Sequence, residues 1–261
     1  MTTTEQQALR ADCVAGADGA LAFTVAGQQA PLVLKRRGAD DEWRLPLTVS
    51  DDGTARAELP ADAELAEGHW DIRTDQDDAV DAGVRDLRTI IGRVPATGRP
   101  VAARIPYATP EGRLAVRSWL RMPHAEAGDI GCAPGRSTMT VEGVLYGAEL
   151  AESAVAEARL RGTDRVHRLE VTREGPAFAF TVAYESLIEQ PVPKEQWWDL
   201  WLLPAEDAAG TRIARILDDV WDKKVIFSYP PLLTDTFRAI PCYTGDNELS
   251  VRVTAVARKT P

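Results

Sequence analysis

The chain has 261 residues, of which 44% are hydrophobic and 27% are charged, and its formal net charge is −10. This length allows one large domain or two of ordinary size, and the apolar fraction is enough to form a buried core. A net charge of −10 argues against nucleic acid and against an anionic membrane surface as partners.

The cysteines and the N-terminus bear on the compartment. Cys13, Cys132 and Cys242 are widely spaced and no CxxC occurs, so we expect neither a disulfide framework nor a metal site. Residues 1–7 lack the basic and apolar segments of a signal peptide, and no apolar run is long enough to span a membrane. We therefore expect a cytoplasmic protein without a cofactor.

Short alternating segments separated by Asp, Gly and Pro turns dominate the first half of the chain. We predict strands, in chain order, at Leu21–Val25, Leu32–Arg36, Trp43–Val49, Ala55–Leu59, Trp70–Thr74, Val101–Ile105 and Leu114–Leu120. Many short strands with regular turns are typical of an antiparallel sandwich with Ig-like architecture. The Cys…Trp…Cys spacing of true immunoglobulin domains does not occur.

One phrase of the sequence occurs twice. Ile105–Arg117 returns as Ile240–Arg252 with identical residues at six of thirteen positions. Both copies are expected to form a strand, a turn and a second strand, because Thr and an acidic residue favour the turn. Gly112 and Asn247 occupy matching positions, and both residue types tolerate a positive φ.

Three further blocks recur in the same order, at an offset that grows from 116 residues to the 135 residues of the repeated phrase. They pair Gly19–Gly27 with Gly135–Gly143, Leu34–Gly38 with Ala158–Gly162, and Gly68–Ile72 with Gln196–Leu200. A duplication in which the second copy gained longer loops explains this pattern. We predict an all-β chain of two tandem, homologous Ig-like sandwiches covering residues 1–121 and 122–261. The added residues are expected in the loops 189–195, 204–210 and 228–234.

Two segments of the second copy have helical features. Ala151–Arg161 contains good helix formers, and Ile213–Val220 has apolar residues at helical spacing. The repeat aligns Ala156–Leu160 with a predicted strand, and propensity alone is weak evidence. We therefore predict a strand there and leave Ile213–Val220 open.

The Trp-Asp strand of the second copy is the most informative local feature. Alternation places Trp198, Leu200 and Leu202 toward the core, as it does Trp70 in the first copy. Trp197, Asp199 and Trp201 then lie on the outer face. They are our first ligand-binding candidates, and Tyr229 and Tyr243 are the next.

Two interpretations of the outer tryptophans stay open. In one, they form a platform on which sugar rings stack or a protein partner is anchored, with the carboxylate accepting hydrogen bonds. In the other, they seal an interface between the two copies or between subunits. Trp119 and Trp221 have the same ambiguity.

No linear motif of a common enzyme class occurs. The three histidines, His69, His124 and His167, are far apart, and neither HExxH, GxSxG, GxGxxG nor a complete P-loop is present. Cys132–Thr138 resembles a phosphate loop faintly but lacks the lysine. Acidic pairs such as Asp218-Asp219, and the run Asp75–Asp78, lie mostly in predicted turns, where Asp serves as a turn former.

The repeated phrase, the Gly-x-Trp-Asp strand and the Arg-Gly turns together resemble a known family. They are similar to the tandem β-sandwich accessory regions of actinobacterial teichoic-acid-type glycosyltransferases and CDP-glycerol glycerophosphotransferases. The resemblance implies an Ig-like fold and a role in polymer binding or oligomerisation. It transfers no catalytic residue, because the DxD-bearing transferase domain has no counterpart in this chain, which we expect to be a free-standing protein.

These observations favour a non-catalytic binding or scaffolding protein that recognises a carbohydrate or polyol polymer, a small molecule or a partner enzyme. The alternative is a cofactor-independent enzyme of an actinobacterial small-molecule biosynthetic pathway, with its site between the two sandwiches. A subunit of a homo-oligomer or of a structural assembly is the third class.

Overall fold

The computed structural model describes residues 9–25, 30–51, 53–188 and 195–256. Residues 1–8 and 189–194, which include the N-terminal segment and most of the predicted loop 189–195, lie outside this description. The described chain consists of β-strands, loops and three short 3₁₀ turns: η1 (Arg88–Ile90), η2 (Pro134–Arg136) and η3 (Tyr184–Leu187). The predicted all-β sandwich class is confirmed. Within these residues, no helix is long and apolar enough to cross a lipid bilayer.

The chain divides into two compact units. The first comprises Met1–Pro95, Ala102–Leu120 and Leu217–Trp221. The second comprises Ala96–Val101, Arg121–Ile216 and Asp222–Pro261.

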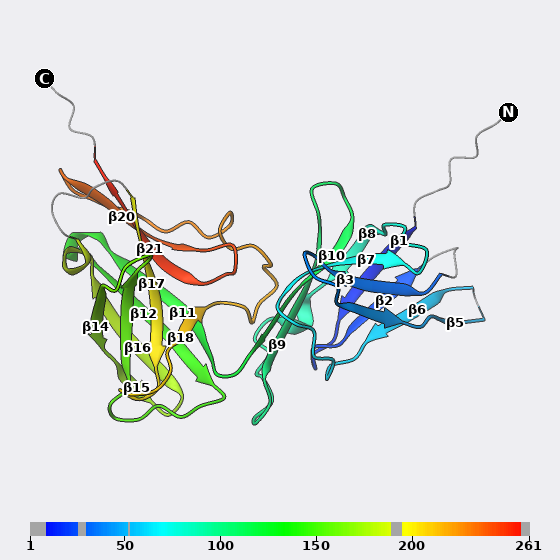
Figure 1. Ribbon diagram of the computed structural model, residues 1–261, viewed down its shortest axis with the longest axis horizontal. Helices are drawn as coiled ribbons and strands as arrows, with labels where there is room; N and C mark the ends of the chain where they lie inside the picture. The colour runs from blue at the N-terminus through cyan, green and yellow to red at the C-terminus, as the bar shows by residue number, and fades with distance from the viewer. Residues whose placement is uncertain (1–8, 26–29, 52, 189–194, 257–261) are drawn as a thin grey trace, which may run out of the picture. The chain divides into compact units, whose positions relative to one another are not determined.

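The first unit has two five-stranded sheets, coloured blue to green in Figure 1. Its strands are β1 (Arg10–Ala15), β2 (Leu21–Val25), β3 (Leu32–Arg36), β4 (Glu42–Leu45), β5 (Thr48–Val49), β6 (Ala55–Leu59), β7 (Gly68–Thr74), β8 (Asp81–Asp86), β9 (Val101–Ala108) and β10 (Leu114–Arg121). One sheet has the order β5-β6-β2-β1-β8 and the other β4-β3-β7-β10-β9. β1 and β8 run parallel.

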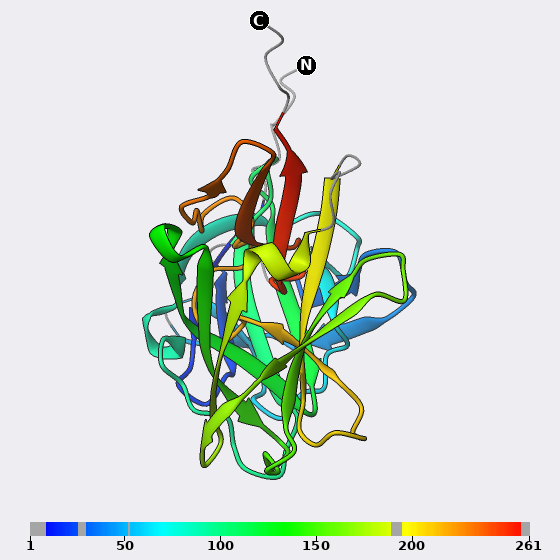
Figure 2. The ribbon, with the colours of Figure 1, turned by 90° about the vertical axis from the view of Figure 1, so that its left-hand side faces the viewer.

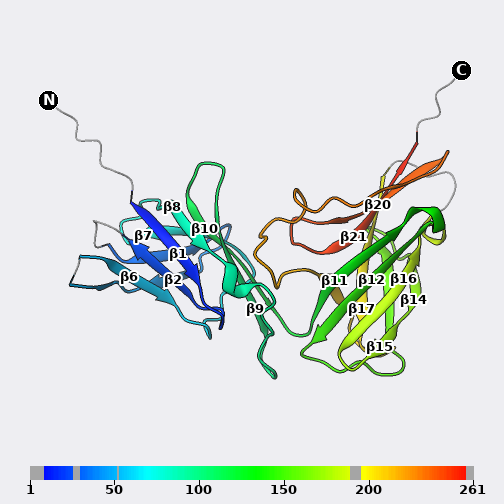
Figure 3. The ribbon, with the colours of Figure 1, turned by 180° about the vertical axis from the view of Figure 1, so that it is seen from behind.

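The second unit continues from green to red in Figure 1. Its strands are β11 (His124–Ala133), β12 (Thr138–Tyr146), β13 (Val155–Leu160), β14 (Val166–Glu170), β15 (Thr172–Glu174), β16 (Ala177–Ala183), β17 (Glu195–Leu203), β18 (Thr211–Ala214), β19 (Leu232–Leu233), β20 (Phe237–Tyr243) and β21 (Leu249–Ala255). β11, β12 and β16 lie side by side in one layer (Figure 3). The yellow β17 and the red β21 are neighbours in the other (Figure 2).

The two units have the same strand order. In the second unit all eleven strands belong to one sheet, because β18 pairs with both β11 and β17. Within that sheet the orders β15-β16-β12-β11-β18 and β14-β13-β17-β21-β20 match those of the two sheets of the first unit, and β11 is parallel to β18 as β1 is to β8. The register also agrees. Trp70 pairs with Val116 as Trp198 pairs with Val251, so these two strand pairs of the units match residue by residue.

Alternation explains which side chains form the cores. Trp70 is 3% exposed and Trp198 is fully buried. In the second unit, Trp198 packs in one core cluster with Val141 of β12 and Phe178 of β16. The core therefore lies between the two layers, as expected for a sandwich.

The repeated phrase forms the hairpins β9–β10 and β20–β21. The turn residues Thr109 and Thr244 donate their amides to the carbonyls of Arg113 and Glu248, at 2.8 and 2.9 Å. Gly112 has a φ of 80° and Asn247 a φ of 57°. The positive φ expected at this position is confirmed in both copies.

Other local expectations need correction or completion. The predicted strand Trp43–Val49 is two strands, β4 and β5, because Pro46 has no amide hydrogen for the ladder. Ala156–Leu160 lies in strand β13, as the repeat indicated, and within Ile213–Val220 only the first two residues are regular, as the end of β18. Strands β1 and β8 were not predicted.

Candidate functional site

The outer face of β17 carries the three first candidates. Trp197, Asp199 and Trp201 are partly exposed, while Trp198 and Leu200 between them are fully buried. The structure thus brings the three candidates together on one face of one strand, beside β21 (Figure 2).

Asp199 is the centre of this face. Its carboxylate accepts two hydrogen bonds from Arg161, at 3.1 and 2.7 Å, and one from the Ser250 hydroxyl at 2.9 Å. Nη1 of Arg212 lies 3.0 Å from Oδ1 of Asp199. Burial alone would raise the pKa of Asp199, but these donors hold it below its ordinary value. The carboxylate is therefore ionised at neutral pH and bound by Arg161, Arg212 and Ser250.

Trp197 lies between two arginines. The guanidinium of Arg161 is 5.2 Å from its ring centroid and that of Arg252 is 5.8 Å. Arg252 belongs to β21, which pairs with one edge of β17, whereas Arg161 follows β13, which pairs with the other edge. Both neighbours are at cation–π distance.

Trp201 has the same surroundings. Arg159 of β13 lies 4.4 Å from its ring centroid, and Arg212 of β18 lies 5.5 Å from it. A sugar ring stacking on either indole would therefore meet an arginine already there. We call this surface the Trp–Arg face; it comprises Arg159, Arg161, Trp197, Asp199, Trp201, Arg212 and Arg252.

Acidic side chains balance the arginines of this face. Glu157, 6% exposed, lies 2.8 Å from Arg159, and Glu195 lies 2.6 Å from Arg252. Glu248 forms an ion pair with Arg212, with Oε2 lying 3.2 Å from Nε. The Trp–Arg face is thus close to charge balance on a chain with a net charge of −10.

Tyr229 and Tyr243, the second-rank candidates, lie elsewhere. Tyr243 is 1% exposed and belongs to the core of the second unit, where burial raises the pKa of its phenol. Tyr229 is partly buried against that core, with its ring centroid 6.3 Å from that of Tyr243. The two tyrosines therefore act in packing in this structure and do not extend the Trp–Arg face.

The flanking arginines were missed from the sequence. Arg159, Arg212 and Arg252 stand on three different strands, and only the strand order brings them to β17. Their alternation with apolar residues was visible, but it does not reveal which strands are neighbours.

Trp119 and Trp221, the other two tryptophans with an open interpretation, have structural contacts within the first unit. Trp119 is fully buried, with the guanidinium of Arg117 4.7 Å from its ring centroid. Trp221 stacks on Tyr107 at 3.9 Å.

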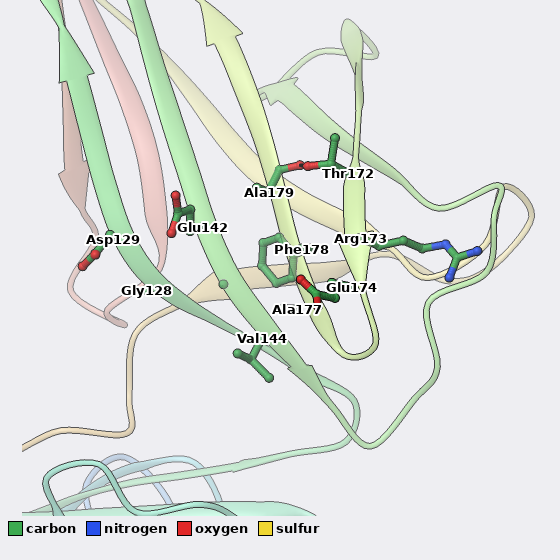
Figure 4. Close-up of a pocket in the computed structure, with 11 residues that line it drawn as sticks. Gly128, Asp129, Glu142, Val144, Thr172, Arg173, Glu174, Ala177, Phe178 and Ala179 are labelled. Carbon is green, nitrogen blue, oxygen red and sulfur yellow. Dashed lines mark hydrogen bonds between the residues drawn. The ribbon is translucent and has the colours of Figure 1, made fainter.

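A separate hollow of about 600 Å³ lies on the other layer of the second unit (Figure 4). Its carboxylates come from three different strands: Asp129 lies on β11, Glu142 on β12 and Glu174 on β15. Arg173 of β15 also lines the hollow. We therefore assign no catalytic group here.

The three cysteines are free, and burial raises the pKa of Cys242 to about 11. The described chain holds no group of three or more His, Cys, Asp or Glu side chains placed to bind a metal ion.

No protein-family model matches the chain. No curated protein matches it in sequence. Among solved structures it is similar to S. aureus TarS, a teichoic acid glycosyltransferase, at 12% identity and a TM-score of 0.40, covering 62% of this chain and 30% of that one. It is also similar to a pullulanase from Anoxybacillus sp. LM18-11 complexed with maltotetraose, at 9% identity and a TM-score of 0.26, covering 82% of this chain and 23% of that one. The chicken CNTN1 FN1–FN3 domains are similar at 9% identity and a TM-score of 0.21, covering 95% of this chain and 84% of that one. TM-scores this low carry no argument about function.

Proposed function

We propose that this chain is a non-catalytic binding and scaffolding protein whose Trp–Arg face docks a second copy of the chain. We further propose that its two sandwiches, residues 1–121 and 122–261, arose by duplication. The shared strand order and register support this second proposal.

The arginines beside each indole carry the proposal. A glycan platform needs open ring faces, whereas Trp197 and Trp201 each have an arginine on either side. Tryptophan and arginine are the residue types enriched at the energetic centres of protein interfaces. The observed arrangement therefore favours a protein partner over stacked sugar rings.

Charge favours a second copy as that partner. Two chains of net charge −10 repel each other at long range. A face on which arginines alternate with Glu157, Glu195 and Glu248 adds no further repulsion at close range, and it offers donors and acceptors to the symmetric copy. Such self-complementarity is what a two-fold interface requires.

The test is the mass of the full chain in solution. Light scattering after size exclusion should show concentration-dependent dimers between about 1 and 300 µM, which spans the affinities of ordinary interfaces. Replacing Trp197 and Trp201 by Ala should weaken the dimer at least ~30-fold, because interface tryptophans commonly contribute about 2 kcal/mol or more. Arg73→Ala, at the register position of Trp201 in the first unit, is the matched control.

Circular dichroism melting should show that the double variant remains folded. A chain that stays monomeric over this range, or a dimer that the double variant leaves intact, contradicts the proposal. Glycan binding that the double variant abolishes would assign the face to carbohydrate instead.

A further inference from the structure

Asp71 of the first unit holds the same register position as Asp199. Asp71 pairs with Ala115 of β10, and Asp199 pairs with Ser250 of β21. Each aspartate also binds an arginine that follows the neighbouring strand, Arg37 in the first unit and Arg161 in the second. The two carboxylates therefore have the same backbone frame and one equivalent partner.

The other donors differ between the units. Asp199 also accepts from Ser250 and lies 3.0 Å from Arg212. The pairings Trp201–Arg212 and Arg73–Ala79 show that Ala79 is the counterpart of Arg212. Alanines thus replace both additional donors around Asp71. Within the described residues, Arg37 is the hydrogen-bond partner of the Asp71 side chain, through Oδ1.

The missing guanidinium leaves space. A hollow of about 470 Å³ opens beside Asp71, within the 300–1,000 Å³ typical of small-ligand sites. Its lining includes Arg37, Asp71, Arg73, Ala79, Glu111 and Arg113. The Asp71 side chain is 34% exposed, and both hydrogen bonds from Arg37 go to Oδ1.

The charges of the lining select the class of ligand. Arg37, Arg73 and Arg113 disfavour a cation, although Arg73 and Arg113 also pair with Asp77 and Asp81. A guanidinium occupies the equivalent place in the second unit. Asp71 and Glu111 disfavour a simple anion. A hydroxyl both donates and accepts, so adjacent hydroxyls can donate to a carboxylate and accept from a guanidinium without a net charge.

We propose that this hollow binds a neutral polyhydroxylated ligand, a sugar or a linear polyol, with one hydroxyl donating to Asp71 and its neighbour accepting from Arg113. The site belongs to the first unit alone. It goes beyond the proposed self-association, shares no residue with the Trp–Arg face, and stands or fails independently of it.

Nitrogen-15-labelled full-length chain provides the test. Titration with sorbitol and with methyl α-glucoside should shift the amide signals of β7 and of the β9–β10 turn, with saturation in the millimolar range expected of a small open site. A deoxy analogue that lacks adjacent hydroxyls should bind at least ~10-fold more weakly, since one hydrogen bond to a charged group is lost.

Two variants locate the site. Ala79→Arg supplies the side chain present in the second unit and should abolish binding by filling the hollow. Asp71→Asn keeps the shape and should weaken binding about tenfold by removing the charged acceptor. Trp197→Ala with Trp201→Ala should leave polyol binding unchanged even if it disrupts the dimer.

Three results would overturn the proposal. The first is the absence of saturable shifts with both polyols in the wild-type chain. The second is binding that persists in folded Ala79→Arg or that Asp71→Asn does not weaken. The third is stronger binding of inorganic phosphate or of arginine methyl ester at the same amides, which would give the hollow to an anion or to a cation.

Discussion

Replacing Asp199 by Ala should destabilise the second unit far more than Asp71→Ala destabilises the first. The Asp199 side chain is 17% exposed and loses contacts to Arg161, Arg212 and Ser250. Arg212, itself 10% exposed, then keeps only part of its compensation. Breaking such a partly buried network costs about 3 kcal/mol, whereas a single pair at a more exposed site contributes about 0–1 kcal/mol.

Calorimetry of the full chain measures the difference. About 3 kcal/mol corresponds to a fall of roughly 10 °C in the melting temperature of a unit of this size. Hydrogen exchange should localise the loss of protection to β17 and β21. Equal effects of the two substitutions, or a cost below about 1 kcal/mol for Asp199→Ala, would refute the argument that its additional donors stabilise the face.

Acid provides an independent check of the same network. The pKa of Asp199 is lower in the folded chain than in an unfolded one, where it is about 3.9. Its contribution is therefore complete above the unfolded pKa and is lost as the pH falls through the folded value. The stability difference between the wild-type chain and Asp199→Asn should be constant above about pH 5 and shrink below about pH 4.

Three further predictions concern single positions. Gly143→Ala should destabilise the second unit by about 1–3 kcal/mol in urea unfolding, because an added Cβ would lie 2.4 Å from the Glu126 carbonyl oxygen and from the Phe178 ring; an unchanged midpoint contradicts this. Asn247→Ala should lower the free energy of unfolding by about 1–2 kcal/mol, because the φ of Asn247 is 57° and its side chain accepts a hydrogen bond from the Lys223 amide. Gly112→Asn should be nearly neutral, and similar costs for the two substitutions in melting experiments would contradict this prediction. At pH 8 a thiol reagent should label native Cys242 very slowly, because a pKa of about 11 leaves about one thousandth as thiolate, and rapid labelling of the native chain would disagree.

Local patterns predicted much of the fold. Strands β2, β3 and β6 begin and end where alternation indicated, and Trp70 and Trp198 are buried as expected. These features depend on neighbours in sequence, which a period of two and a turn signal describe. The repeat also predicted that β13 is a strand, against its helix propensity.

Long-range pairing could not be read in the same way. β8 contains Asp81, Gly83 and Asp86, which are poor strand formers, and is held by parallel pairing with β1. The arginines beside Trp201 come from β13 and β18, and their convergence depends on strand order. The candidate tryptophans were therefore predicted, while the contacts that change their interpretation were not.

The parallel pairing of β1 and β8 has a consequence for synthesis on the ribosome. β2 follows β1 closely in the sequence and pairs with one of its edges, but the other edge stays unpaired until residues 81–86 have been synthesised. An open edge can pair wrongly in that interval, and charged outward side chains reduce the risk. Arg10 and Asp12 supply those charges on β1, and Asp12 then accepts the Val84 amide at 2.7 Å when β8 arrives. The same carboxylate thus protects the nascent edge and fastens the finished sheet.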